Sequence, residues 1–282
     1  ITAVTNLVSN TGVVATDTSG VGTARYALAA ATYGYDKAIF GYGTADGNTN
    51  LSITNLVSNT GVVGNNVTGV GTARVYLAAA GYGTDKAIFG YGVIIGTGSV
   101  STTNLVSNTG VVGNDVTGVG TARNRLAAAG YGYDKAIFGY GDSGSPSYGV
   151  SLTNLVSNTG VVGNDVTGVG TVRIGLAAAG YGGDKAIFGY GITSALGTYY
   201  SLTNLVSNTG VVATDTTGVG TARSSPSAAG YGTDKAIFGF GYPGGPSYTS
   251  ITNLVSNTGV VGNNVTGVGT DRALLAAAGY GT

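Results

Sequence analysis

A ten-residue phrase, Thr-Asn-Leu-Val-Ser-Asn-Thr-Gly-Val-Val, occurs six times in this chain, with its first asparagine at positions 6, 55, 104, 154, 204 and 253. The copies lie 49 or 50 residues apart, so the phrase marks a tandem repeat that covers the whole chain. Short apolar runs separated by Gly and Asn at such a period are typical of β-propeller blades or solenoid turns. Positions identical in all copies are expected to be framework, and the others are free to carry a function.

The composition narrows the classes of partner and chemistry. The net charge is zero and only 9% of residues are charged, which argues against nucleic acid or an anionic membrane surface as a partner. No cysteine is present, so disulfides and thiolate metal sites are excluded. No apolar run approaches the ~20 residues of a membrane-spanning helix, so we expect no membrane insertion. The absence of oxidisable Met and Cys suits an extracellular setting.

Each copy is predicted to form four short strands. In the second copy these cover residues 74–80, 86–92, 103–107 and 111–112. The first is rich in alanine, as expected where strands converge on a central axis, and the second is apolar on both faces, as expected between neighbouring sheets. Gly110 supplies the positive φ of a tight turn between the third and fourth strands. In the fifth copy Pro226 falls in the first strand, which predicts an edge position for it.

The motif Ala-Arg-x-x-Leu-Ala-Ala-Ala-Gly-Tyr-Gly-x-Asp-Lys-Ala-Ile-Phe-Gly-Tyr-Gly resembles the kelch repeat over nearly the whole chain. That family has an Arg before the innermost strand, a small apolar run, and an aromatic second strand that ends in paired glycines. Here Gly-Tyr-Gly replaces the glycine pair and no Trp follows. The resemblance implies a propeller of four-stranded blades, and it suggests a phage or environmental surface protein, located outside the cell or on a virion.

Counting the strands indicates how the array closes. There are six copies of the first, third and fourth strands but five of Asp-Lys-Ala-Ile-Phe-Gly. We therefore expect one all-β domain over residues 1–282, a six-bladed propeller whose closing blade is shared by N- and C-terminal strands. The missing second strand suggests a longer parent chain. A linear β-solenoid is the alternative architecture.

An arginine occupies one position in every copy. A ring of unpaired positive charge would be costly, so we expect a structural clasp that donates to carbonyls or to a neighbouring Asp, rather than an anion site. The Asp-Lys pairs before the second strands are expected to be exposed pairs at turns. The six arginines are Arg25, Arg74, Arg123, Arg173, Arg223 and Arg272.

Two sets of positions differ between the copies. The variable dipeptides follow each arginine and are 26–27, 75–76, 124–125, 174–175, 224–225 and 273–274. The variable loops follow the second strands and are 44–50, 93–101, 142–150, 192–200 and 242–249. In an up-and-down blade both sets lie at the same end, which predicts a ligand-binding face there. Neutral drift of exposed loops is the alternative explanation.

The residues of that predicted face suit binding more than chemistry, because Tyr, Ser, Gly and Asn combine rigid aromatic area with adaptable hydrogen bonding. We expect a glycan or a protein surface as the ligand. The candidate ligand-binding residues are Tyr26, Tyr76, Asn124, Arg125, Tyr148, Tyr199, Tyr200, Tyr242 and Tyr248.

An enzymatic role is not expected, because His, Cys and Glu are absent and the few carboxylates outside the framework form no acid/base pair. The sequence predicts no catalytic residue, no metal and no cofactor. The function it favours is a non-catalytic binding or adhesion module. The alternative is a structural spacer or assembly module of a virion or cell surface, associated with other structural proteins.

Overall fold

The computed structural model describes residues 1–144, 149–193 and 197–281. These residues form short β-strands and no helix, so none of them belongs to a helix that could cross a membrane. Five antiparallel sheets have three strands each, and one further pair forms a small hairpin. The prediction of an all-β fold built from repeated units is confirmed.

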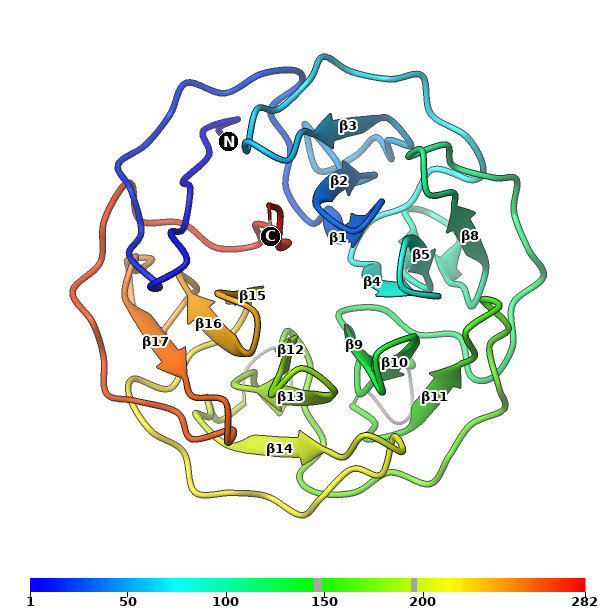
Figure 1. Ribbon diagram of the computed structural model, residues 1–282. Helices are drawn as coiled ribbons and strands as arrows, with labels where there is room; N and C mark the ends of the chain where they lie inside the picture. Colours follow the sequence, from blue (N-terminus) through cyan, green and yellow to red (C-terminus); the bar gives the residue numbers. More distant parts are fainter. Residues whose placement is uncertain (145–148, 194–196, 282) are drawn as a thin grey trace.

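Each three-stranded sheet has an inner, a middle and an outer strand in chain order (Figure 1). The inner strands are β1 (Ala29–Tyr33), β4 (Ala78–Tyr82), β9 (Ala127–Tyr131), β12 (Ala177–Tyr181) and β15 (Ser227–Tyr231). The middle strands are β2 (Lys37–Gly41), β5 (Lys86–Gly90), β10 (Lys135–Gly139), β13 (Lys185–Gly189) and β16 (Lys235–Gly239). The outer strands are β3 (Thr54–Val57), β8 (Thr103–Val106), β11 (Thr153–Val156), β14 (Thr203–Val206) and β17 (Thr252–Val255). The hairpin is β6 (Val93–Ile94) with β7 (Gly98–Ser99).

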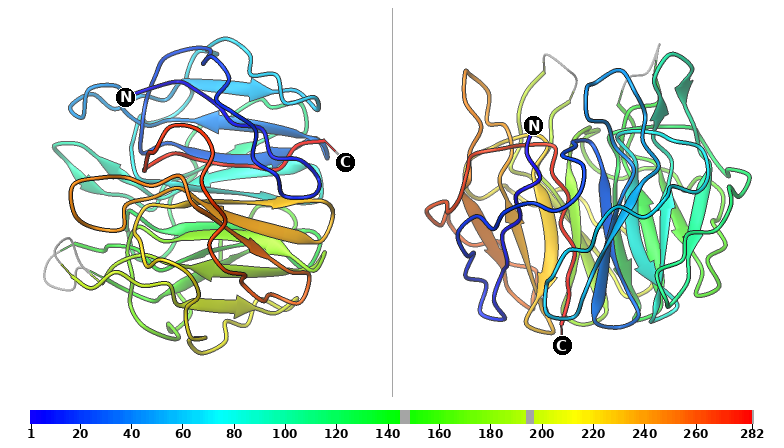
Figure 2. Two further views of the ribbon diagram at one scale, coloured as in Figure 1. Left: turned by 90° about the vertical axis from the view of Figure 1, so that its left-hand side faces the viewer. Right: turned by 90° about the horizontal axis from the view of Figure 1, so that it is seen from above.

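The sheets are arranged around a central axis, with the inner strands nearest to it (Figure 1). The strands run along this axis, so the connecting loops gather at its two ends (Figure 2). An N-terminal segment, residues 5–18, and a C-terminal segment, residues 272–281, lie between the β15–β16–β17 sheet and the β1–β2–β3 sheet (Figure 1).

Small residues on the inner strands allow neighbouring strands to approach closely. A Cβ atom added to Gly130 on β9 would lie 3.3 Å from the carbonyl oxygen of Gly81 on β4. The first copy has Thr32 at this position, and its hydroxyl donates to the carbonyl oxygen of Gly279 at 2.9 Å. The alanine and glycine content of these strands therefore reflects their convergence on the axis.

The middle strands form the core between sheets. On β5, Ala87, Ile88 and Phe89 are all fully buried, as expected for a strand covered on both faces. The ring of Phe89 contacts Tyr42 of the preceding sheet edge to face, with centroids 5.1 Å apart. Each sheet is thus fastened to its neighbour by aromatic contacts as well as by aliphatic packing.

Three details of the predicted strands are wrong. The fourth strand is reduced to isolated bridges such as Val106 with Val112, because the side chain of Asn104 donates to the carbonyl oxygen of Gly113 and replaces a ladder bond. The first strand begins at Ala78 rather than at residue 74, since Tyr76 has a φ of 55° that interrupts an extended backbone. Pro226 lies just before β15 and not within it.

The two terminal segments are joined by side-chain hydrogen bonds. Thr270 donates to the Asp17 carboxylate from its backbone nitrogen at 3.1 Å and from its hydroxyl at 2.5 Å. Asn6 donates to the same carboxylate at 2.8 Å, and Arg272 donates to the side-chain oxygen of Asn6. An equivalent set of contacts recurs within the sheets, so the terminal segments reproduce the arrangement of a repeat unit.

The Asp17 contacts predict a pH dependence of stability. Hydrogen bonds from the Thr270 and Asn6 side chains hold the pKa of Asp17 at about 2, below its ordinary 3.8. The ionised carboxylate is therefore favoured by folding, and its contribution is present above pH 4 and is lost as the pH falls towards 2. We expect the thermal unfolding temperature to fall over this range.

The variant Asp17→Asn should show a smaller fall, because it removes the titrating group while keeping an acceptor. The same exchange exists in the chain, because Asn66 follows Asn55 at the same spacing as Asp17 follows Asn6. Asn66 accepts from the Thr23 backbone nitrogen at 3.2 Å and donates to the Thr23 hydroxyl at 2.8 Å. Unfolding temperatures measured from pH 5 to pH 2 for both proteins test this. Equal falls in the two proteins would contradict it.

Candidate ligand-binding face

The structure brings the variable dipeptides and the variable loops to the same end of the axis. The first residue of each of the first five dipeptides forms a bridge with the beginning of the loop that follows in its sheet. The bridged pairs are Tyr26 with Thr44, Val75 with Val93, Asn124 with Asp142, Ile174 with Ile192, and Ser224 with Tyr242. The turns between inner and middle strands lie at the opposite end (Figure 2).

The second residues of the dipeptides form a cycle of backbone hydrogen bonds around the axis. For example, the Tyr76 nitrogen donates to the Ala27 oxygen at 2.9 Å, and the Arg125 nitrogen donates to the Tyr76 oxygen at 2.9 Å. The cycle runs through Ala27, Tyr76, Arg125, Gly175, Ser225 and Leu274, and returns from the Ala27 nitrogen to the Leu274 oxygen at 3.0 Å.

All members of this cycle have a positive φ, from 51° at Ser225 to 58° at Leu274, although only one of them is glycine. Non-glycine residues seldom adopt this conformation, so the surrounding structure must hold it in place. One consequence is that consecutive side chains of the cycle lie close together. The Arg125 guanidinium lies over the Tyr76 ring, 4.9 Å from its centroid.

Three of the candidate tyrosines form a second group on the fourth and fifth variable loops. The Tyr242 ring contacts Tyr199 and Tyr248 edge to face, with both centroid distances at 5.8 Å. Tyr248 remains 54% exposed, and the Tyr242 hydroxyl donates to the carbonyl oxygen of Gly245 at 2.6 Å. Burial and the neighbouring Tyr242 raise the pKa of Tyr199, so its hydroxyl is a neutral donor at physiological pH.

The remaining candidates lie apart from these two groups. Tyr26 lies before β1 and forms a bridge with Thr44. The Asn124 amide donates to the Ser99 hydroxyl at 2.9 Å and to the Asp142 carbonyl oxygen at 3.3 Å, and so joins two adjacent variable loops. Tyr200 donates its backbone nitrogen to Gly191 at 2.9 Å, and it has no ring contact among the described residues. Tyr148 lies outside the described residues. The eight candidates among the described residues therefore share one end of the molecule without forming one pocket.

Two of the variable dipeptide positions have buried side chains. Val75 is 1% exposed and Ile174 is 2% exposed, and both pack beneath the loops. Sequence variation at these two positions changes the core and not a surface available to a ligand.

The arginines form hydrogen-bonded clasps. Arg74 is fully buried and donates to the carbonyl oxygens of Tyr91 at 2.8 Å and Thr72 at 2.9 Å, and to the side-chain oxygen of Asn104 at 2.7 Å. Its guanidinium lies 4.5 Å from the centroid of the Tyr42 ring in the preceding sheet. Asn104 accepts from the guanidinium without adding a second buried charge. The expected Asp partner is present for two other arginines, since Nη1 of Arg123 lies 3.7 Å from Asp165 and Nη1 of Arg272 lies 3.5 Å from Asp17.

Arg25 is the exception to this pattern. It is 8% exposed, yet its side chain makes one hydrogen bond to the described residues, from Nη1 to the Thr23 carbonyl oxygen at 3.2 Å. Its Nε and Nη2 atoms are buried without a hydrogen-bond partner. Burial lowers the pKa of Arg25 to about 10, so the guanidinium stays charged at neutral pH in an environment that does not satisfy it.

Sequence reasoning missed the role of the tyrosine in Gly-Tyr-Gly. Tyr91 has a φ of 63°, is fully buried, and donates its hydroxyl to the Val119 carbonyl oxygen at 3.1 Å. Its ring contacts Phe138 and lies beneath Arg123 of the next sheet. The repetition of Gly-Tyr-Gly was the available signal, but a repeat alone does not tell which neighbour a side chain meets.

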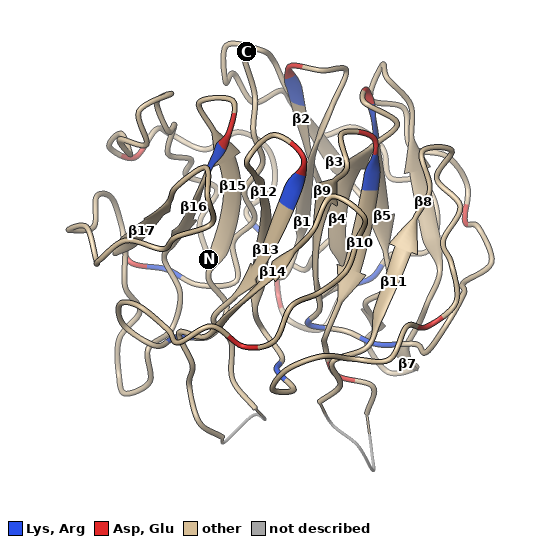
Figure 3. Cartoon of the chain, turned by 60° about the horizontal axis from the view of Figure 1, so that its bottom comes forward, with Lys and Arg blue, Asp and Glu red and all other residues tan. Residues whose placement is uncertain are grey.

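The opposite end carries the charged pairs. Figure 3 shows lysine and aspartate side by side at the turns before the middle strands, and the Lys86–Asp85 distance is 2.9 Å. These pairs are half-exposed, as expected, and such pairs contribute little to stability because solvent screens them. Among the described residues no group of acidic, His or Cys side chains could hold a metal ion.

Comparisons of the chain with protein-family models and with curated protein sequences give no match. The arrangement of sheets and side chains is therefore the basis for the functional proposal.

Proposed function

We propose that the chain is a closed six-bladed, kelch-like β-propeller whose sixth blade combines the N-terminal and C-terminal segments. The cycle of backbone hydrogen bonds through Leu274 and Ala27 supports closure, as do the contacts of Asp17 with Thr270. A linear solenoid would have no reason to bring residues 27 and 274 within hydrogen-bond distance.

We further propose that this propeller is a non-catalytic binding or adhesion module, acting outside the cell or on a virion surface. The observation that carries the proposal is the aromatic group of Tyr199, Tyr242 and Tyr248, which presents exposed ring area at the end where the copies differ. Aromatic residues that keep one face accessible and a polar hydroxyl are typical of recognition surfaces.

A glycan is the preferred ligand class, with a protein surface as the alternative. Sugar rings present C–H faces that pack on tyrosine rings, and their hydroxyls bond to the hydroxyl and backbone groups that surround this group. Arg125 over Tyr76 adds a cationic site near the axis. Four framework arginines, Arg74, Arg123, Arg173 and Arg223, are excluded from the ligand site, because they are fully buried and use their donors internally.

Tyr199→Ala and Tyr248→Ala should each weaken ligand binding by roughly tenfold while leaving the unfolding temperature nearly unchanged. The matched control is Tyr133→Ala, which removes a tyrosine that is 77% exposed on the turn between β9 and β10 at the other end. A glycan array and cell binding by the purified chain identify the ligand, and titration of the three variants locates the site. Equal losses in all three variants would contradict this placement.

A purely structural or assembly module is the second candidate, favoured by the burial of Val75 and Ile174. It predicts that replacing the variable loops with Gly-Ser leaves every interaction unchanged. Loss of binding in that variant supports recognition by the loops. Binding that survives the replacement places the site elsewhere, and absence of binding in both proteins favours the structural role.

A further inference from the structure

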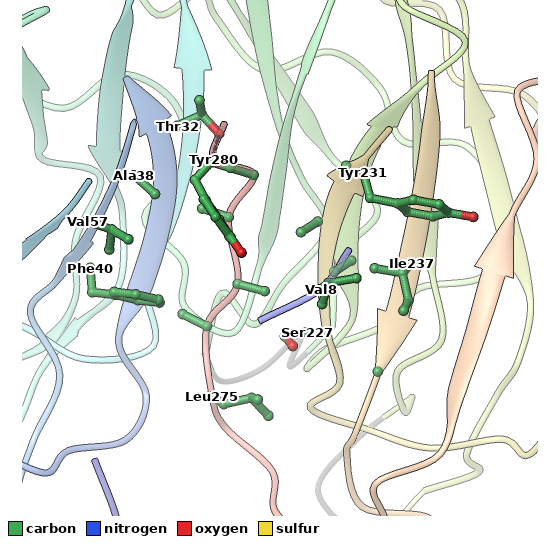
Figure 4. A pocket seen from close by; sticks show the side chains of 18 of the residues that line it. Val8, Thr32, Ala38, Phe40, Val57, Ser227, Tyr231, Ile237, Leu275 and Tyr280 are labelled. Carbon is green, nitrogen blue, oxygen red and sulfur yellow. Dashed lines mark hydrogen bonds between the residues drawn. The ribbon is translucent and has the colours of Figure 1, made fainter. Parts of the chain in front are cut away.

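A cavity of about 1450 Å³ opens between the first and fifth sheets and the two terminal segments, and it continues along the axis, where Tyr82, Tyr131 and Tyr181 of the other three sheets line it. In Figure 4, Phe40 and Ala38 of β2 lie on one side of it and Ile237 of β16 lies on the other, with Tyr280 of the C-terminal segment between them. The lining is mostly apolar. Its position in the repeat indicates what kind of molecule fits it.

Elsewhere in the molecule this position holds a middle strand. Ile137 on β10, for example, is paired with Ala129 on the inner strand and with Leu155 on the outer strand. The equivalent positions in the terminal segments are Ala278 and Leu7. Between these two segments the described residues place no strand, and residues from both segments line the cavity.

The walls of the cavity match the two faces of a middle strand. Four strand-end glycines face a phenylalanine ring of the next sheet, so that an added Cβ atom would lie 2.6 to 2.8 Å from the ring carbon Cζ. These glycines are Gly41, Gly90, Gly139 and Gly189. The fifth, Gly239, faces the cavity instead, and its added Cβ atom would meet only the Thr252 methyl group, at 3.2 Å. On the opposite wall Phe40 is partly exposed, whereas the other middle-strand phenylalanines are fully buried.

Arg25 supplies an independent indication. Each of its five equivalents lies over an aromatic ring of the preceding sheet, at 4.1 to 4.9 Å from the ring centroid. Arg25 lines the cavity, has no such ring among the described residues, and retains two buried nitrogen atoms without partners. An aromatic side chain entering the cavity would cover this guanidinium.

We propose that the cavity binds an extended polypeptide strand with the pattern of the protein's own middle strands, Lys-Ala-Ile-Phe-Gly followed by an aromatic residue. The phenylalanine ring of this strand packs on Gly239, and the ring of Phe40 packs on the glycine of this strand. The last aromatic residue of the strand lies beneath Arg25. Its backbone pairs with the two terminal segments, as added strands do at open sheet edges. Each contact repeats one made between the sheets.

The probe is a fluorescently labelled peptide, Asp-Lys-Ala-Ile-Phe-Gly-Tyr-Gly, titrated with the 282-residue chain and followed by anisotropy. The control peptide has alanine in place of its Phe and Tyr. We expect saturable binding of one peptide per chain, and binding of the control weaker by at least about tenfold. Gly239→Ala should weaken binding of the probe to a similar extent, because its methyl group occupies the place of the phenylalanine ring, while the unfolding temperature stays unchanged.

Several results would overturn the proposal. They are no binding at millimolar peptide, equal binding of both peptides, or unaltered binding by the Gly239 variant. Size-exclusion chromatography with light scattering tests whether a second copy of the chain occupies the cavity instead of the peptide. A dimer that Gly239→Ala dissociates, and that the peptide does not, would mean that a second copy fills the cavity.

Discussion

Replacing Arg123 with methionine is expected to destabilise the protein by about 3–5 kcal/mol, the largest effect of any single substitution that we predict. Arg123 is fully buried, donates to the carbonyl oxygens of Tyr140 at 2.9 Å and Thr121 at 3.1 Å, and bonds to the Asn154 side chain at 2.5 Å. Methionine fills much of the volume but leaves these acceptors buried and unsatisfied. Denaturant unfolding followed by circular dichroism measures the loss.

Arg25→Met is the matched control. Arg25 occupies the equivalent position of the repeat, but its Nε and Nη2 atoms have no hydrogen-bond partner. Its replacement therefore removes one hydrogen bond and also removes a buried charge. We expect a change of less than about 1 kcal/mol. If both substitutions cost the same, the hydrogen bonds of the clasp would not be the source of its stability.

Gly139→Ala is expected to cost about 1–3 kcal/mol, the range for overpacking a close-packed interior. An added Cβ atom would lie 2.6 Å from Cζ of Phe188 and 3.0 Å from its Cε1, and the ring is fully buried with no room to move. The contact between the third and fourth sheets would have to open. A fall in unfolding temperature of about 2–4 °C per kcal/mol makes the effect measurable by calorimetry.

Gly239→Ala provides the comparison within the same strand motif. Its nearest neighbour would be the Thr252 methyl group at 3.2 Å, and Gly41 and Gly90 have the same contact with their own Thr. We expect little change in unfolding temperature for this variant alone. If Gly239→Ala lowered the unfolding temperature as much as Gly139→Ala does, the loss of stability would come from the backbone and not from a clash with a facing ring.

Much of the local structure was predictable because turn and strand signals are short-range. The middle strands and the Gly110 turn follow from apolar runs bounded by glycine, and the alanines of the inner strands follow from convergence on an axis. The fourth strand was not predictable in this way. The Asn104 side chain competes for the Gly113 carbonyl, and only the folded geometry places an amide there.

The candidate binding face was predictable in part. Alternation of strand direction places the variable dipeptides and loops at one end, and the bridges between them have that arrangement. The grouping of Tyr199 with Tyr242 depends on the meeting of two loops from different sheets. The sequence of one loop does not determine how that loop packs against a loop of the neighbouring sheet.

The sequence by itself determined the repeat, the all-β character and the positions that must stay small. The tertiary structure decided which identical residues have identical roles. Arg25 and Arg123 both follow Gly-Val-Gly-Thr-Ala, yet Arg25 has unsatisfied donors and Arg123 forms a complete clasp. Gly139 and Gly239 differ in the same way. The reason is physical: turns and strands arise from neighbouring residues in the chain, whereas burial and hydrogen bonding depend on the sheet that lies alongside.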